Sequence, residues 1–315
     1  MLGPRPVLRD VSGEPVTSES NVPMVRAGSG RVRRVAVFYC VTFLITHALV
    51  FGYLLSGGSF RRLDSFAFAN LTMLVPGVVA ACTARFYFRE PVGRVLGLSI
   101  RFNRWFVFAW LGPLLLSGLT LLGGLAVPGT AYSAELAGLM ARFELNPEQL
   151  RMLVHPIGSL APLGSLIAQA VILGPTLSAI AGLGEEAGWR GLLHNELGQL
   201  GFWRESWLVG ALWGVWHLPL VFEGYGFPNY PFAGAGLLLA FTLLAAPLYT
   251  LIRIRAESTL ACAIFHGSFS ASMLLTFAPV AGGNELSVGS LAVPGVLVLG
   301  LANAVLACLP ARYRA

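Results

Sequence analysis

The chain has 315 residues, of which 56% are hydrophobic and only 11% are charged, and its formal net charge is +6. This composition, with a mean hydropathy of +0.71, excludes an ordinary soluble domain, in which roughly a quarter of the residues are charged. The sequence contains no glycine-rich nucleotide loop and no nucleic-acid-binding module. We therefore expect an all-α, polytopic membrane helix bundle whose surroundings are the lipid bilayer and whose partners include no nucleic acid.

Eight apolar runs approach the roughly 20 residues that a helix needs to cross about 30 Å of hydrocarbon. They lie at about 35–56, 66–84, 106–127, 159–183, 207–222, 233–252, 258–278 and 291–309. Residues 1–34 are rich in Pro, Gly, Ser and Arg, and this composition predicts a disordered cytoplasmic tail. The membrane domain is then expected at 35–309, with a cytoplasmic C-terminus at 310–315.

The segment between the third and fourth runs differs from the rest. Residues 133–154 have apolar positions at helical spacing, and Asn146-Pro147 is typical of an N-cap followed by the first residue of a helix. This pattern predicts a pair of amphipathic helices that lie on the outer surface of the membrane.

Arginine placement predicts the orientation, because cytoplasmic loops carry the excess of positive charge. With both termini in the cytoplasm, nearly all of the basic residues fall on the cytoplasmic side. The exceptions are Arg61, Arg62, Arg142 and Arg151. We therefore expect a multi-pass protein of the cell membrane with cytoplasmic N- and C-termini.

Three short motifs within residues 159–278 place ionisable groups in or beside the apolar runs. They are GEEAGWR at 184–190, WGVWH at 213–217 and FHGSFS at 265–270. Ionisable groups are costly in hydrocarbon, so their presence inside apolar runs predicts a functional site by default.

The two motif histidines are expected at similar depths in the membrane. His217 lies about 15 Å from the cytoplasmic end of its run and His266 about 12 Å, at 1.5 Å per helical residue. The fourth run is longer than one crossing needs, so we expect its helix to continue through Glu185 and Glu186 toward Leu197. The carboxylates would then meet the histidines, and we expect water to reach them from the cytoplasmic side.

The spacing of the first motif separates the roles of its two carboxylates. Glu186 and Arg190 are four residues apart, which predicts a helical ion pair that keeps Glu186 charged. Glu185 is rotated by about 100° and is free to deprotonate a water molecule. His217 and His266 could stabilise the oxyanion that forms when this water attacks an amide carbonyl. Alternatively, Glu185, His217 and His266 could bind zinc, with the remaining carboxylate as the base.

At these residues the chain resembles the type II CAAX prenyl endopeptidase family, also called the CPBP or Abi family of intramembrane proteases. The family pattern is E-E-x-x-x-R, an aromatic residue four positions before His, and H-x-x-x-N. The first element is matched by Glu185, Glu186 and Arg190, the second by Trp213 and His217, and the third by His266.

This resemblance covers residues 160–280 and implies endoproteolysis of a membrane-bound or prenylated peptide within the membrane. It implies that Glu185 activates water and that the histidines and the family's Asn support the oxyanion, and it leaves a metal requirement open. The chain departs from the pattern at Ser270, which stands where the family usually has Asn.

Two other functions could account for ionisable residues at these positions. A proton-coupled transporter also places Glu and His at mid-membrane, but it should show paired broken helices or a repeat between its halves, and neither is evident. A catalytically silent relative that acts as an immunity factor or a membrane scaffold is the alternative that Ser270 supports.

The tryptophans and the remaining histidines are not expected to take part in catalysis. Packing or interfacial roles are expected for Trp189, Trp213 and Trp216, and Trp213 also shapes the pocket in this prediction. The histidines placed outside the site are His47, His155 and His194.

Overall fold

A computed structural model describes residues 29–60, 65–154 and 160–310. The structure is 77% helical, and its two strands, β1 (Ala131–Tyr132) and β2 (Val280–Ala281), form one short antiparallel pair. The prediction of an all-α membrane helix bundle is therefore confirmed. The proposed N-terminal tail lies almost entirely outside the described residues, and α1 (Ser29–Leu55) already includes residues 29–34.

A helix occupies each of the eight predicted apolar runs. The helices, in chain order, are α1, α2 (Ser65–Thr72) with α3 (Leu74–Cys82), α5 (Arg104–Leu125), α8 (Pro162–Leu173) with α9 (Ala179–Glu186) and α10 (Leu193–Leu197), α11 (Phe202–Phe222), α12 (Pro231–Ala256), α13 (Thr259–Ser272) and α14 (Val293–Cys308). Within the described residues, six helical stretches are long and apolar enough to cross a membrane: 30–55, 67–88, 104–125, 162–200, 231–256 and 259–276.

The helices of the fifth and eighth predicted runs are not among these six. The fifth, α11, is long enough at 21 residues but is made more polar by Arg204, Glu205 and His217. The eighth, α14, is apolar but has only 16 residues. Length and composition thus support six of the eight predicted spans.

The fourth predicted span forms a continuous helical stretch of 39 residues, 162–200. Its first part, α8, passes through a π-helical turn at Gly174–Ser178 into α9, and a second π-helical segment at Ala187–Leu192 leads into α10. The helix does continue through Glu185 and Glu186, as expected. π-helical turns are rare and are frequent at functional sites, and the second one directly follows the two carboxylates.

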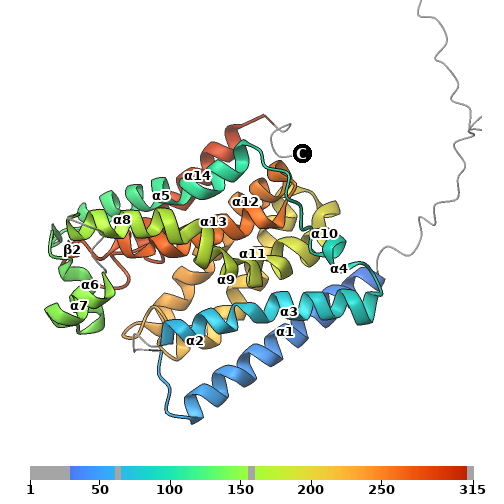
Figure 1. Ribbon diagram of the computed structural model, residues 1–315, viewed down its shortest axis with the longest axis horizontal. Coiled ribbons are helices and arrows are strands. Elements are labelled where there is room, and N and C mark those ends of the chain that lie inside the picture. The colour runs from blue at the N-terminus through green and yellow to red at the C-terminus, as the bar shows by residue number, and fades with distance from the viewer. Residues whose placement is uncertain (1–28, 61–64, 155–159, 311–315) are drawn as a thin grey trace, which may run out of the picture.

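The predicted amphipathic pair is present as α6 (Ala137–Phe143) and α7 (Pro147–Leu153). Asn146 caps α7 through a reciprocal pair of hydrogen bonds with Gln149, and Pro147 occupies the first turn. These two helices lie beside β2 at one end of the bundle, whereas α4 (Val92–Val95) and α10 lie at the opposite end (Figure 1).

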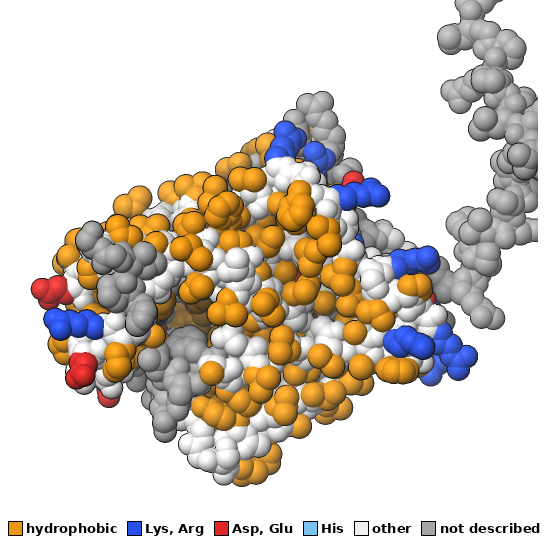
Figure 2. All heavy atoms as spheres, in the orientation of Figure 1, with side chains coloured by type: hydrophobic (Ala, Val, Ile, Leu, Met, Phe, Trp, Pro, Cys, Tyr) orange, Lys and Arg blue, Asp and Glu red, His pale blue; other side chains and the backbone are white. Residues whose placement is uncertain are grey.

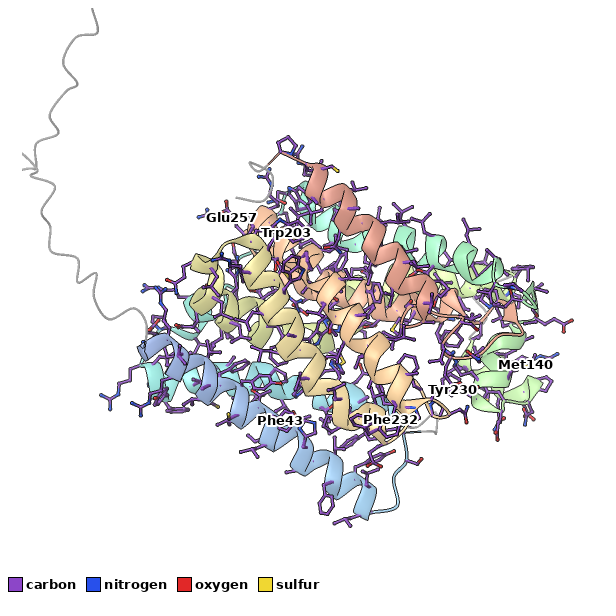
Figure 3. The ribbon with its side chains drawn as sticks, turned by 180° about the vertical axis from the view of Figure 1, so that it is seen from behind. Phe43, Met140, Trp203, Tyr230, Phe232 and Glu257 are labelled. Atoms are coloured by element: carbon purple, nitrogen blue, oxygen red, sulfur yellow. The ribbon has the colours of Figure 1, made fainter. Side chains whose placement is uncertain are left out.

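The two ends differ in charge. Figure 2 shows a broad hydrophobic band between an end where arginines gather and an end with few charged side chains. Figure 3 places Trp203 and Glu257 at the arginine-rich end, and Met140 and Tyr230 toward the other. We call the latter the α6–α7 end.

Small residues let α13 approach the fourth helical stretch closely. A Cβ added at Gly267 would lie 2.3 Å from the backbone nitrogen of Ala179, and one at Gly182 would lie 2.9 Å from the carbonyl oxygen of Ala263. Small residues at membrane helix interfaces permit this backbone-to-backbone packing. As a result the side chains of α9 and α13 meet in the interior of the bundle.

Candidate active site

The two motif carboxylates are buried at the end of α9. The exposed fraction is 1% for Glu185 and 0% for Glu186. Nη1 of Arg190, which is also buried, lies 3.2 Å from Oε1 and 3.1 Å from Oε2 of Glu186. Glu186 and Arg190 therefore form the ion pair that their spacing predicts. Removing either partner would leave a buried charge uncompensated.

The rest of the Arg190 guanidinium faces aromatic rings. Its central carbon lies 4.2 Å from the ring centroid of Tyr249 and 5.0 Å from that of Trp213. Among the described residues, Nε and Nη2 of Arg190 have no hydrogen-bond acceptor. Contact with the ring faces stabilises a cation in such a position, so Arg190 belongs to the wall behind the carboxylates.

Glu185 is held by indole groups and forms no ion pair with any residue that the structure describes. Its Oε2 accepts hydrogen bonds from Nε1 of Trp213 at 2.6 Å and from Nε1 of Trp189 at 3.2 Å. Within the described part of the chain, its second oxygen accepts no hydrogen bond. The carboxylate is thus oriented through one oxygen, which leaves the other available for a reacting molecule.

Both motif histidines lie close to the indole ring of Trp213. The indole ring centroid of Trp213 is 5.9 Å from each imidazole centroid, that of His217 and that of His266. Nδ1 of His266 donates to Oε1 of Glu186 at 2.8 Å, and Nδ1 of His217 donates to the carbonyl oxygen of Trp213 at 3.0 Å. Because both acceptors lack a proton, each Nδ1 carries one and each Nε2 remains available to the site.

A cavity of about 90 Å³ joins these groups. Five of the seven site residues predicted from the sequence line it: Glu185, Trp213, His217, His266 and Ser270. Glu186 and Arg190 lie behind its wall. Ser270 is the exposed member of the group, so it lies at the margin of the cavity, one helical turn beyond His266.

Sequence reasoning missed three residues of this site. Trp189 was assigned to packing, yet it donates to Glu185, and the spacing of four residues within one helix could have shown this contact. Tyr249 lines the cavity from α12 beneath Arg190, in a run without a recognisable motif.

Tyr225 reaches the cavity from the loop after α11, where no periodicity applies. Burial raises the pKa of Tyr225 to about 12, so its hydroxyl remains protonated and able to donate at neutral pH.

His47 and His194, which the sequence analysis placed outside the site, do not line the catalytic cavity. Nδ1 of His47 contacts the carbonyl oxygen of Phe43, and His194 pairs with Glu205. His155 lies outside the described residues.

The donor types of a His₂Glu zinc site are present, and both Nδ1–H groups are held by oxygen acceptors, as is common for metal-ligating histidines. Throughout the described ranges, no three His, Cys, Asp or Glu residues come close enough together to hold a metal ion.

Comparison with protein families gives a match to this part of the chain. Residues 167–272 match the family described as type II CAAX prenyl endopeptidase Rce1-like. A comparison with curated proteins gave no match. The family resemblance inferred from the three motifs is thus confirmed, and it supports a membrane-embedded protease of the CAAX type. The matched segment runs from α8 to the end of α13 and contains all seven predicted site residues.

Proposed function

We propose that this protein is an intramembrane endopeptidase that hydrolyses a peptide bond of a membrane-associated or lipidated peptide with Glu185 as the general base. The observation that carries the proposal is the asymmetric environment of the two carboxylates. Glu186 is neutralised by Arg190 and hydrogen-bonded to His266. Glu185 has no cationic partner among the described residues and lines the cavity with an oxygen to spare.

In the proposed reaction, Glu185 takes a proton from a water molecule while the water oxygen attacks the carbonyl carbon of the scissile amide. The resulting oxyanion accepts a hydrogen bond from Nε2–H of a doubly protonated His266, whose Nδ1–H stays hydrogen-bonded to Glu186. The carbon–nitrogen bond then breaks, and the proton held by Glu185 passes to the leaving nitrogen. Nε2 of His217 accepts a hydrogen bond from the attacking water and so orients it.

The test is proteolysis by the purified protein on prenylated and unprenylated peptides, comparing wild type with Glu185→Gln. The amide keeps the shape of the side chain but cannot act as a base, so we expect cleavage to be abolished while the protein stays folded. Glu223→Gln, which changes an exposed carboxylate on the next loop, is the matched control. Cleavage by Glu185→Gln at the wild-type rate would refute the assignment.

Zinc content is measured on the same preparations. One equivalent of zinc in the wild type, lost in a His217→Ala/His266→Ala variant, would replace the glutamate-only mechanism with a metal-dependent one. If neither wild type nor any variant cleaves, the silent immunity or scaffold function becomes the better explanation.

A further inference from the structure

The loop after α11 begins with a Schellman motif. Gly224 has a φ of 98°, in the left-handed region that favours glycine. The backbone nitrogen of Gly224 donates to the carbonyl oxygen of Val221 at 2.9 Å, and that of Tyr225 donates to the carbonyl oxygen of Leu220 at 3.0 Å. These bonds satisfy carbonyl groups at the end of α11 and turn the chain back over its last turn. Gly226, with a φ of 74°, follows, so Tyr225 is held between two glycines.

This motif brings the side chain of Tyr225 to the catalytic cavity. A Schellman motif is often accompanied by apolar contact between the residue after the glycine and the residue five positions earlier. Tyr225 accordingly packs against the buried cluster that contains Leu220 and Phe60. Its ring is perpendicular to that of Phe60, with 6.0 Å between the centroids. Leu220 and Tyr225 both line the cavity, so packing fixes the ring of Tyr225 in the cavity wall.

The hydroxyl of Tyr225 lies inside the protein and within electrostatic range of Glu185. Burial is the largest cause of the raised pKa of Tyr225, and the negative charge of Glu185 raises that pKa further. Among the described residues, none accepts a hydrogen bond from this hydroxyl, and it is not one of the atoms enclosed without a partner. The hydroxyl therefore has free space beside it. A cavity of about 90 Å³ holds only a few water molecules, at roughly 30 Å³ each, so this donor and Glu185 share one small space.

Most other donors in the cavity wall are already engaged. The hydroxyls of Thr72 and Thr242 donate to carbonyl oxygens of their own helices, at 2.7 Å and 3.1 Å. Nε1 of Trp213 donates to Glu185. Ser270 carries its hydroxyl on a short, exposed side chain at the margin of the cavity. The tyrosine hydroxyls therefore remain as the donors that the wall can offer to a reacting molecule.

The cavity is lined by two tyrosines, Tyr225 and Tyr249. The guanidinium carbon of Arg190 lies 4.2 Å from the ring centroid of Tyr249, so Tyr249 belongs to the surroundings of the ion pair with Glu186. Tyr225 contacts neither partner of that pair among the contacts that the structure describes. It is therefore the tyrosine whose hydroxyl is not committed to the wall behind the carboxylates.

We propose that Tyr225 is a further catalytic residue, whose hydroxyl donates a hydrogen bond to the oxyanion formed from the scissile amide. This rests on the proposed function, in which His266 also donates to that oxygen. Before the reaction, the hydroxyl faces a negatively charged Glu185. When Glu185 takes the proton of the attacking water, negative charge develops on the substrate oxygen instead, so the donor stabilises the transition state more than the ground state. The proton of Tyr225 stays on its own oxygen throughout.

The test is the turnover number and KM of Tyr225→Phe on the prenylated and unprenylated peptides. Phenylalanine keeps the packing against Leu220 and Phe60 and removes only the donor. The turnover number should therefore fall about a hundredfold, while KM and the melting temperature stay near their wild-type values. Tyr230→Phe, which changes an exposed tyrosine at the end of the same loop (Figure 3), is the matched control and should leave all three unchanged.

A double variant separates the loss of a donor from a local change in packing. Ser270→Asn places an amide donor elsewhere on the cavity wall, so it should raise the turnover number by a larger factor in Tyr225→Phe than in the wild type. Equal factors in the two backgrounds, or a wild-type turnover number in Tyr225→Phe, would overturn the role of Tyr225 and leave the proposed function intact. If the wild type cleaves neither peptide, the proposed function and the role of Tyr225 are both overturned.

Discussion

Nε1 of Trp213 on α11 lies 2.6 Å from Oε2 of Glu185 on α9, across 28 residues of sequence. The same indole contacts both motif imidazoles edge-on. Trp213 is therefore the residue through which the three motifs meet, and the sequence had assigned it only to packing and to the shape of the pocket. Its hydrogen bond is the shorter of the two that orient the proposed base, the other being donated by Trp189.

Trp213→Phe should lower the rate of proteolysis by about tenfold to a hundredfold. Phenylalanine keeps most of the aromatic packing but removes a hydrogen bond to a charged acceptor, which is worth about 1.5–3 kcal/mol. Cleavage rates and melting temperatures of Trp213→Phe are compared with those of Trp207→Phe, a half-exposed tryptophan on the same helix. Equal activity in the two variants would show that the indole does not orient the base.

The ion pair behind the site should matter for stability as well as for activity. Glu186→Gln and Arg190→Gln each leave a buried charge unpaired, so each should reduce the free energy of unfolding by about 3–5 kcal/mol. The double variant should lose less than the sum of the two losses, because no lone charge remains. Thermal unfolding in detergent measures the stability of the single and double variants, with the exposed Glu148→Gln as control. Loss of activity at an unchanged melting temperature would instead make Glu186 the base and Glu185 the structural carboxylate.

The close approach of α13 to the fourth helical stretch gives a third prediction. In Gly267→Ala the added Cβ would lie 2.4 Å from the carbonyl oxygen of Gly174 as well as close to Ala179. The helices must then move apart, at a cost of about 1–3 kcal/mol, and His266 should move away from Glu186. We expect a lower melting temperature and lower activity together. Gly236→Ala on α12, where a Cβ meets nothing within 4 Å, should change neither.

Much of this architecture can be predicted from the sequence because hydrocarbon imposes strong constraints. Each predicted apolar run is helical, since a backbone in lipid must satisfy its own hydrogen bonds. The motif spacing also predicts the pairing of Glu186 with Arg190. What the sequence does not show is set by packing between distant segments. The partner of Glu186 on α13 is His266, 80 residues away, and the return of Tyr225 into the cavity depends on an irregular loop.

The polarity of α11 illustrates the same limit. The sequence has an apolar run at 207–222, but the whole helix is more polar than the six stretches that could cross a membrane by length and composition, and Trp213 and His217 line the shared cavity. Functional residues lower the hydropathy of the helix that carries them.

The last prediction concerns Ser270, one helical turn after His266 and at the margin of the catalytic cavity. A serine hydroxyl supplies one donor on a short side chain, whereas the asparagine usual in the family reaches further and supplies two. If this position supports the oxyanion, Ser270 does so at shorter range or through a water molecule. Loss of one such donor can cost about 3–4 kcal/mol of transition-state stabilisation.

We therefore expect Ser270→Asn to raise the turnover number and Ser270→Ala to lower it, with little change in melting temperature because the side chain is exposed. Ser268→Ala is the matched control two residues earlier on α13. Its buried hydroxyl has no hydrogen-bond partner among the described residues, and it does not line the cavity, so turnover should stay at the wild-type value. If both Ser270 variants cleave at the wild-type rate, the position lies outside the oxyanion site, and other residues of the cavity must supply the donors.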